Sequence, residues 1–243
     1  MGTSLLADVC AAMRRLVPPG VVCSAGPIAA DYPPLAPAEL AATGQMRSTR
    51  LQEFSAGRAH ARKVLRELGL PSPTIPVSAD RAPEWPPGFV GSISHAGDLV
   101  VVVAAPGTVL PAIGVDLEPC VPLDIELLNR VCRPEEVARI RSSPAALHRA
   151  KLVFSAKESV YKCVAPLTGV FLEFADVEIL FGPDGDGFYA HGHGPAEALI
   201  TSETVRGRFV AVGGYWLTVA WQWPHVRPEV RSEPRPAPGG TQG

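Results

Sequence analysis

The segment FSAKESVYK, residues 154–162, places a glutamate between two lysines in otherwise apolar surroundings. Glu158 and Lys162 are four residues apart, so on a helix they share a face and can form an ion pair. On an exposed helix such a pair contributes only about 0.3–0.5 kcal/mol, and a surface pair is the simple interpretation. The neighbouring positions, however, are mostly apolar and leave little of this helix free to face water. A carboxylate beside both Lys157 and Lys162 would suit a metal ligand or a proton acceptor close to a phosphate.

The segment GVDLEP, residues 114–119, carries two acids at strand spacing. Successive side chains of a strand alternate between its faces, so Asp116 and Glu118 point to one face while Val115 and Leu117 point to the other. Adjacent carboxylates repel each other, and a divalent cation removes that cost. Oxygen ligands of this kind suit Mg²⁺ better than Zn²⁺. The alternative is an acidic strand end exposed to solvent.

Basic and hydroxyl side chains supply candidate phosphate ligands elsewhere in the chain. Ser94 and His95 end the segment GSISH, which alternates like a strand. Arg58, Arg62 and Arg66 repeat every four residues, as on one face of a helix, and Arg50 lies upstream. A solvated basic face and a structural histidine are the alternatives for these two groups. The spacing of His191 and His193 could fit a metal, but the glycines between and after them favour a turn.

The elements that must position these residues follow from apolar periodicity. Residues 46–68 predict a long helix that ends before Gly69 and Pro71. Strands are predicted over 87–95, 99–104 and 111–118, then one or two short helices over 123–141. A second long helix is expected over 145–164, followed by strands within 170–223. The tail, residues 225–243, is rich in Pro and Gly, and we expect it to be disordered.

Composition excludes several classes of protein. The chain has 243 residues and a net charge of −2, which gives no reason to expect nucleic acid or a membrane as a partner. The most apolar stretch is interrupted by prolines, and the N-terminus lacks the basic start of a signal peptide. Five scattered cysteines without a C-x-x-C pair argue against a disulfide framework or a zinc site. We therefore expect reduced thiols and a cytoplasmic location.

Four segments taken in order, GRAHARKVLRELG, APEWPPGFVGSISHAG, GVDLEP and FSAKESVYK, resemble the 4′-phosphopantetheinyl transferase superfamily. The resemblance covers roughly residues 45–180 and is to the Sfp-type branch, especially enterobactin-synthetase-component-D-like and actinobacterial members. It implies transfer of the 4′-phosphopantetheine arm of coenzyme A to a serine of an apo acyl or peptidyl carrier protein, releasing adenosine 3′,5′-bisphosphate. The enzyme would be of the holo-[acyl-carrier-protein] synthase type. Fatty-acid, polyketide and nonribosomal-peptide carriers all remain open as substrates.

The resemblance also implies a fold and a division of the chain. The fold would be α+β, a pseudo-dimer of two similar α/β subdomains with the active site in the cleft between them. We expect an N-terminal subdomain over 1–112, on the nucleotide side, and a C-terminal subdomain over 113–224, with the carboxylates and the catalytic helix. Because both halves of the cleft lie in one chain, we expect a monomer.

By motif match, Asp116, Glu118 and Glu158 would hold Mg²⁺, or Mn²⁺ as a substitute, on the pyrophosphate. The catalytic residues would be Glu158, Lys162 and Asp116. Glu158 would accept the serine proton, directly or through a metal-bound water, and Lys162 would neutralise charge that develops on the phosphates.

The residues implied in binding coenzyme A are Arg50, Arg58, Arg81, Ser94, His95, Lys157 and Lys162. Of these, His95 and Lys157 would contact phosphate, and Arg50 and Arg58 would hold the 3′-phosphate. Arg81 would bind on the adenine side of coenzyme A. In the loop on that side, some relatives carry a basic residue directly before a proline.

Two other functions would use the same residues. One is a Mg²⁺-dependent nucleotide pyrophosphohydrolase, which would need no carrier protein. The other is a relative that binds coenzyme A or a carrier without catalysis. The intact set of Asp116, Glu118, Glu158 and Lys162 argues against the second.

Overall fold

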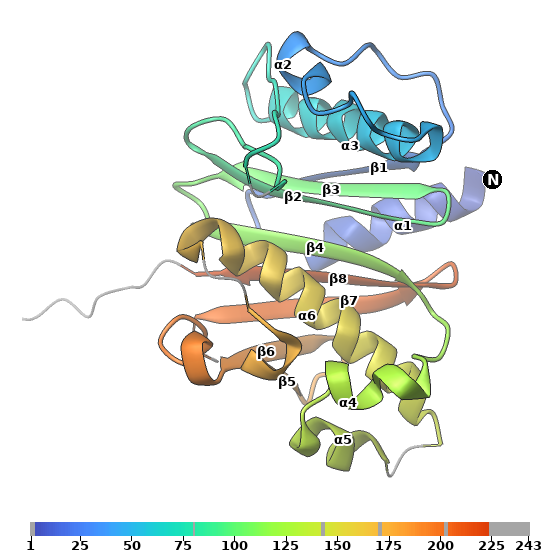
Figure 1. Ribbon diagram of the computed structural model, residues 1–243, viewed down its shortest axis with the longest axis vertical. Coiled ribbons are helices and arrows are strands. Elements are labelled where there is room, and N and C mark those ends of the chain that lie inside the picture. Colours follow the sequence, from blue (N-terminus) through green and yellow to red (C-terminus); the bar gives the residue numbers. More distant parts are fainter. Residues whose placement is uncertain (1–2, 80, 142–143, 170–171, 202–203, 224–243) are drawn as a thin grey trace, which may run out of the picture.

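The computed structural model describes residues 3–79, 81–141, 144–169, 172–201 and 204–223. Two antiparallel sheets follow one another along the long axis of the molecule, and each is covered by one long helix (Figure 1). The expected α+β class is confirmed. The two halves, each a sheet with its own long helix, correspond to the expected pseudo-dimer.

The N-terminal half contains a three-stranded sheet in the order β1-β3-β2. Its elements are α1 (Thr3–Leu16), β1 (Val22–Pro27), α2 (Pro37–Leu40), α3 (Ser48–Glu67), β2 (Phe89–Ala96) and β3 (Leu99–Pro106). The central strand β3 is apolar along its length because both of its faces are covered. Val100 and Val102 pack with α3, whereas Val101 and Val103 pack with α1 on the other face.

The C-terminal half contains a five-stranded sheet in the order β4-β8-β7-β6-β5. Its strands are β4 (Ala112–Pro119), β5 (Val177–Phe181), β6 (Gly187–Gly192), β7 (Val205–Val212) and β8 (Tyr215–Gln222). Its helices are η1 (Ile125–Leu127), α4 (Leu128–Val131), α5 (Pro134–Arg141), α6 (Ala146–Thr168), η2 (Phe174–Asp176) and η3 (Gly194–Ala196). Helix α6 lies across this sheet and carries the segment FSAKESVYK (Figure 1).

One hydrophobic core joins the two halves. Side chains of α1 and β3 pack there with those of β4 and β8, among them Met13, Val101, Val115 and Val219. The halves therefore cannot move apart without exposing buried apolar surface. The seam between them is a fixed part of the fold.

The predicted long helices and the strands 87–95, 99–104 and 111–118 are confirmed within a few residues. Helix α1 and strand β1 were not predicted from the sequence. The division at residue 112 stays a prediction, although the chain changes sheets between the end of β3 at Pro106 and the start of β4 at Ala112. The tail expected to be disordered lies outside the described residues. Among the described helices, none is both long and apolar enough to cross a membrane.

Candidate active site

The site depends on an unusually close contact between α6 and β4. A Cβ atom at Gly114 would lie 1.9 Å from the Ser159 carbonyl oxygen and 2.6 Å from the Cys163 amide nitrogen. Only glycine fits there without moving the helix backbone. This contact brings the side chains of α6 next to the strand that carries Asp116.

Asp116 is the centre of the site and receives hydrogen bonds from three side chains on two elements, β2 and α6. Its Oδ1 accepts from Ser94 Oγ of β2 at 3.0 Å and from Lys162 Nζ of α6 at 2.6 Å. Its Oδ2 accepts from Ser155 Oγ at 2.8 Å. The carboxylate is almost fully buried, at 3% exposure. Charge-assisted bonds of this kind hold the two halves together at the point where the chemistry is expected.

The polar side chains of α6 form a stripe on the face toward the cleft. Lys151, Ser155, Glu158 and Lys162 follow the spacing i, i+4, i+7, i+11, which places them one above the other on a helix. Ser155 Oγ also lies 3.0 Å from Thr218 Oγ1 of β8. Lys151, Ser155 and Lys162 of this stripe thus contact residues of β4 or β8.

Glu158 is half-buried within this stripe, and among the described residues no hydrogen bond to its carboxylate is found. Burial raises the pKa of Glu158, Lys162 lowers it, and the nearby acids Asp116 and Glu118 raise it further. The charges of Asp116 and Glu118 are thus close enough to act on Glu158. A carboxylate with a raised pKa and a free face is suited to accept a proton.

Glu118 is paired with a residue that sequence reasoning did not select. Lys151 Nζ donates to Glu118 Oε2 at 2.5 Å and lies 4.8 Å from the centre of the Phe154 ring. The i, i+4, i+7, i+11 stripe was the signal that could have identified both Lys151 and Ser155.

The N-terminal half contributes a second cluster around His95. Arg50 donates to His95 Nε2 at 2.8 Å and to Glu53 Oε2 at 3.0 Å. Burial lowers the pKa of His95, Glu53 raises it, and the cations Arg50 and Lys162 lower it. An imidazole that accepts from Arg50 at Nε2 is neutral, with its proton on Nδ1.

Arg58 lies in the same half but is nearly buried, at 5% exposure. Its guanidinium stacks over the Phe54 ring at 4.3 Å and donates weakly to the Pro76 carbonyl at 3.4 Å. Among the described residues its Nε has no partner, and burial lowers its pKa to about 10. A buried guanidinium with an unused donor is expected where an anion binds. By contrast Arg62, on the same face of α3, is fully engaged by Glu39 and the Pro33 carbonyl.

Arg81 lies apart from these groups, in the loop before β2. It is exposed and has a φ of 68°, which is uncommon for a residue other than glycine. Within the described part of the chain, no contact joins it to Asp116, His95 or Glu158.

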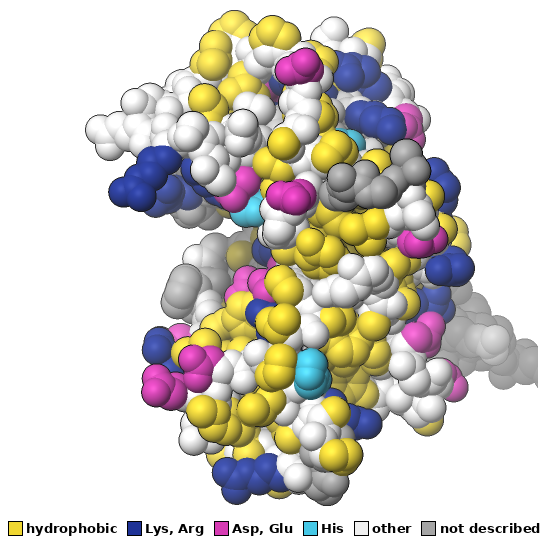
Figure 2. All heavy atoms as spheres, turned by 90° about the vertical axis from the view of Figure 1, so that its right-hand side faces the viewer, with side chains coloured by type: hydrophobic (Ala, Val, Ile, Leu, Met, Phe, Trp, Pro, Cys, Tyr) yellow, Lys and Arg dark blue, Asp and Glu magenta, His cyan; other side chains and the backbone are white. Residues whose placement is uncertain are grey.

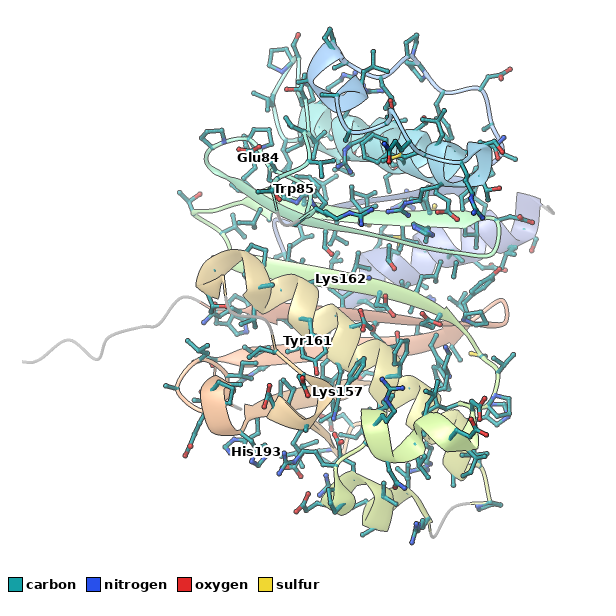
Figure 3. All side chains as sticks on the ribbon, in the orientation of Figure 1. Glu84, Trp85, Lys157, Tyr161, Lys162 and His193 are labelled. Atoms are coloured by element: carbon teal, nitrogen blue, oxygen red, sulfur yellow. The ribbon has the colours of Figure 1, made fainter. Side chains whose placement is uncertain are left out.

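Lys157 does not reach the cleft, and the expectation that it contacts phosphate is corrected here. Its ammonium group is fully buried and donates to Glu136 Oε2 at 2.7 Å and to the carbonyls of Val131 and Phe174. Successive residues of a helix point about 100° apart, so Lys157 faces α4 and η2 while Glu158 faces the cleft. Figure 3 shows Lys162 beside β4 and Lys157 lower on α6.

The space-filling view shows a hollow between the two halves (Figure 2). Acidic, basic and histidine side chains gather around it, whereas the surface below it is largely apolar. The structure thus brings Ser94, Asp116 and Lys162 into direct contact, with His95, Glu118 and Glu158 around them.

Comparison with known proteins identifies the family. Residues 37–105 match the model of the 4′-phosphopantetheinyl transferase N-terminal domain, and residues 112–220 match that of the 4′-phosphopantetheinyl transferase superfamily. The chain belongs to this superfamily. The resemblance inferred from the sequence motifs is confirmed, and with it the expectation of phosphopantetheinyl transferase activity.

Relatives come from both groups that the motifs suggested. The chain is 35% identical to 4′-phosphopantetheinyl transferase Svp of Streptomyces mobaraensis, over 72% of this chain and 70% of Svp. It is 33% identical to 4′-phosphopantetheinyl transferase Npt of Nocardia iowensis, over 74% of this chain and 83% of Npt. Enterobactin synthase component D of Escherichia coli is 35% identical over 51% of this chain and 58% of that protein. The superfamily uses coenzyme A as a substrate.

Proposed function

We propose that this protein transfers the 4′-phosphopantetheine arm of coenzyme A to a serine hydroxyl of apo acyl or peptidyl carrier proteins. The observation that carries the proposal is the junction of Ser94, Asp116 and Lys162 between the two halves, with the unpaired Glu158 carboxylate beside it. A displacement at phosphorus needs positioning and neutralised charge more than covalent help from the protein.

The donor set suits a hard divalent cation, Mg²⁺ or in its place Mn²⁺. Within the described residues, no three His, Cys, Asp or Glu side chains converge closely enough to hold a metal by themselves. Mg²⁺ does not require this, because it commonly binds one or two carboxylates together with waters and substrate phosphates. Asp116, Glu118 and Glu158 would hold it, and their mutual repulsion is what a cation would relieve. When bound, Mg²⁺ would neutralise charge on the pyrophosphate of coenzyme A.

The side chains of this protein would then carry out the transfer in one displacement. The serine oxygen forms a bond to the phosphorus that bears the pantetheine arm, and its proton passes to Glu158. The bond from this phosphorus to the bridging oxygen breaks, and adenosine 3′,5′-bisphosphate leaves with the electron pair. Lys162, which now donates to Asp116 and Ser94, is in reach to stabilise the charge on the leaving phosphate.

Coenzyme A would extend from this point toward the N-terminal half. His95 and Ser94 would contact the pyrophosphate, and Arg50, which donates to His95, supports this direction. Arg58, with its unpaired Nε, would bind the 3′-phosphate together with Arg50. Arg81 remains the candidate for the adenine side, supported by its exposure and by its strained backbone, since strain of this kind concentrates at functional sites.

We further propose that the enzyme acts as a monomer in the cytoplasm, where coenzyme A and carrier proteins are found. Its proposed enzyme type is that of the holo-[acyl-carrier-protein] synthases. The carriers served, whether of fatty-acid, polyketide or nonribosomal-peptide systems, are to be determined by experiment.

Intact-mass spectrometry tests the function directly. The protein is incubated with coenzyme A, Mg²⁺ and an apo carrier protein, and we expect the carrier to gain the mass of one phosphopantetheine arm. Glu158→Gln should abolish most of this gain, while Glu197→Gln, a change at an exposed acid, should not. Release of adenosine 3′,5′-bisphosphate without a carrier would instead identify a pyrophosphohydrolase. Failure with every class of carrier would reject the transferase.

A further inference from the structure

A cavity in the N-terminal half lies outside the active site. It has a volume of about 490 Å³ and lies where α1, β1 and the C-terminal part of α3 meet. Arg50 and Arg58, the cations proposed for coenzyme A, come from the earlier turns of α3, whereas Lys63 and Glu67 line this cavity. The transferase chemistry therefore leaves the cavity without a role.

Three sulfur side chains line this cavity together. Cys10 and Met13 are three residues apart on α1, so they share one face of that helix, and Cys23 comes from β1. Both cysteines are free and partly exposed, while Met13 is fully buried. The chain has only five cysteines and three methionines, so two thiols and a thioether in one cavity are a notable concentration of soft donors.

The two thiols lie close enough to influence each other. Burial raises the pKa of the Cys23 thiol, the Arg14 guanidinium lowers it, and Cys10 and Glu67 raise it. The Cys23 thiol is therefore not a reactive thiolate of the kind that drives redox signalling. A soft metal ion can still bind there, because it displaces the thiol proton.

We propose that Cys10, Cys23 and Met13 form a binding site for a soft monovalent metal ion, with Cu(I) as its chemical type. Thiolate and thioether sulfur select Cu(I) over harder ions. Such an ion is satisfied by two thiolates, with the Met13 sulfur as a further donor. Zinc would need four ligands, and among the described residues no third acid, histidine or cysteine joins the pair.

The charges around the cavity fit this ion. Two thiolates and one monovalent ion carry a net charge of −1, and two protons are released when the complex forms. Arg14 and Lys63 contribute two positive charges and Glu67 one negative charge, which leaves a lining of net charge +1. The complex is thus neutralised by side chains that are already present. The bound ion would link α1 to β1, because its two thiolate ligands come from these two elements.

Competition with a chelator tests the proposal on the full-length protein. Cu(I) is supplied under anaerobic reducing conditions in the presence of bathocuproine disulfonate, and transfer from the chelator is followed by absorbance and by native mass spectrometry. We expect the wild-type protein to take one Cu(I). Cys10→Ser and Cys23→Ser each remove a direct sulfur ligand, so each should lower the apparent affinity by more than the roughly 10–100-fold that loss of an outer-shell partner costs. Cys120→Ser, a partly exposed cysteine in the other half, serves as the matched control and should retain it.

Two further measurements separate this site from adventitious thiol binding. An ion that binds only the folded state stabilises that state. One equivalent of Cu(I) should therefore raise the melting temperature of the wild type and of Cys120→Ser. It should not raise the melting temperature of Cys10→Ser. X-ray absorption at the copper edge should show sulfur neighbours only. Equal Cu(I) affinity in the wild type and in Cys10→Ser/Cys23→Ser would overturn the proposal, as would failure of the wild type to compete with the chelator. Neither result bears on the transferase function.

Discussion

Glu158 is half-buried and Arg58 is buried, and their replacement should affect the reaction in different ways. Glu158→Gln keeps the shape of the side chain and removes its capacity to accept a proton. Because a positioned base is worth roughly 10²–10⁴-fold in rate, we expect kcat to fall by that amount at any coenzyme A concentration. Arg58→Ala should instead weaken the binding of coenzyme A by roughly 1.5–3 kcal/mol, and saturating coenzyme A should restore the turnover of this variant.

Steady-state kinetics with varied coenzyme A separates the two outcomes. The melting temperature of Arg58→Ala has to be measured alongside, because its guanidinium stacks on Phe54 and its loss also removes packing. If saturating coenzyme A brings Glu158→Gln close to wild-type turnover, the carboxylate only binds substrate and is not the base.

Unlike its neighbour Glu158, Lys157 stabilises the fold of the C-terminal half. Glu136 accepts from Lys157 and from the amides of Arg133 and Ile179, so α4, α5, α6 and β5 meet at this pair. Lys157→Met would leave the Glu136 charge buried without its ammonium partner. We expect a loss of about 3–5 kcal/mol in the free energy of unfolding, measured by denaturant titration. The KM for coenzyme A of the folded fraction should stay unchanged, and a large rise in that KM would place Lys157 at the substrate after all.

His60 provides a pH-dependent contribution to stability. Burial, with a smaller effect of Lys63, lowers its pKa to about 4, while Ser24 and Tyr32 form hydrogen bonds with the ring. The unfolded chain, with a pKa near 6.5, binds the proton more readily, so this stability is fully present above pH 6.5 and is lost as the pH falls toward 4. Between pH 7 and pH 5 the loss should be roughly 2 kcal/mol.

Urea unfolding of the wild type and of His60→Gln at these two pH values tests this expectation. Glutamine can keep both hydrogen bonds but does not titrate, so its stability should change less over the same interval. An identical pH dependence in the two proteins would mean that other groups are responsible.

At the scale of elements, the contact of α6 with β4 is the feature on which the site depends most. Gly114→Ala would drive a Cβ atom into the Ser159 carbonyl, which is helix backbone and cannot rotate away. We expect a marked loss of stability, in the range of about 1–3 kcal/mol for overpacking, together with a loss of activity as Lys162 and Glu158 move from Asp116. Gly44→Ala is the matched control, because a Cβ there meets nothing within 4 Å. Full activity and unchanged melting of Gly114→Ala would show that this contact is not required.

The elements that carry the site were predictable because their patterns are strong. Helix α6 has a long apolar periodicity, β3 contains four consecutive valines before a turn, and β4 alternates apolar and acidic residues at strand spacing. Strand β1 was missed because its sequence, VCSAGP, consists mostly of small residues. One of them, Gly26, is required by tertiary packing, since a Cβ there would lie 2.2 Å from the ring of His60. The sequence also could not reveal that Lys157 pairs with Glu136, 21 residues away, because local spacing says nothing of such a partner.

For the whole molecule, the site is assembled from two halves of one chain. Ser94 comes from the N-terminal sheet, Asp116 from β4 and Lys162 from α6, and all three are joined by hydrogen bonds of 2.6–3.1 Å. The shared core of α1, β3, β4 and β8 keeps these halves in register. No residue from a second subunit is needed to complete the proposed cluster, so the active species should be a monomer.

Light scattering coupled to size-exclusion chromatography tests this, with transferase activity measured across the same peak. The active fractions should give a mass near that of one chain, 25.7 kDa. Dilution should leave the specific activity unchanged, because a site within one chain does not depend on protein concentration. A larger species as the only active one, or activity that is lost on dilution, would mean that a second subunit supplies part of the site. The cluster around Asp116 would then be incomplete as described.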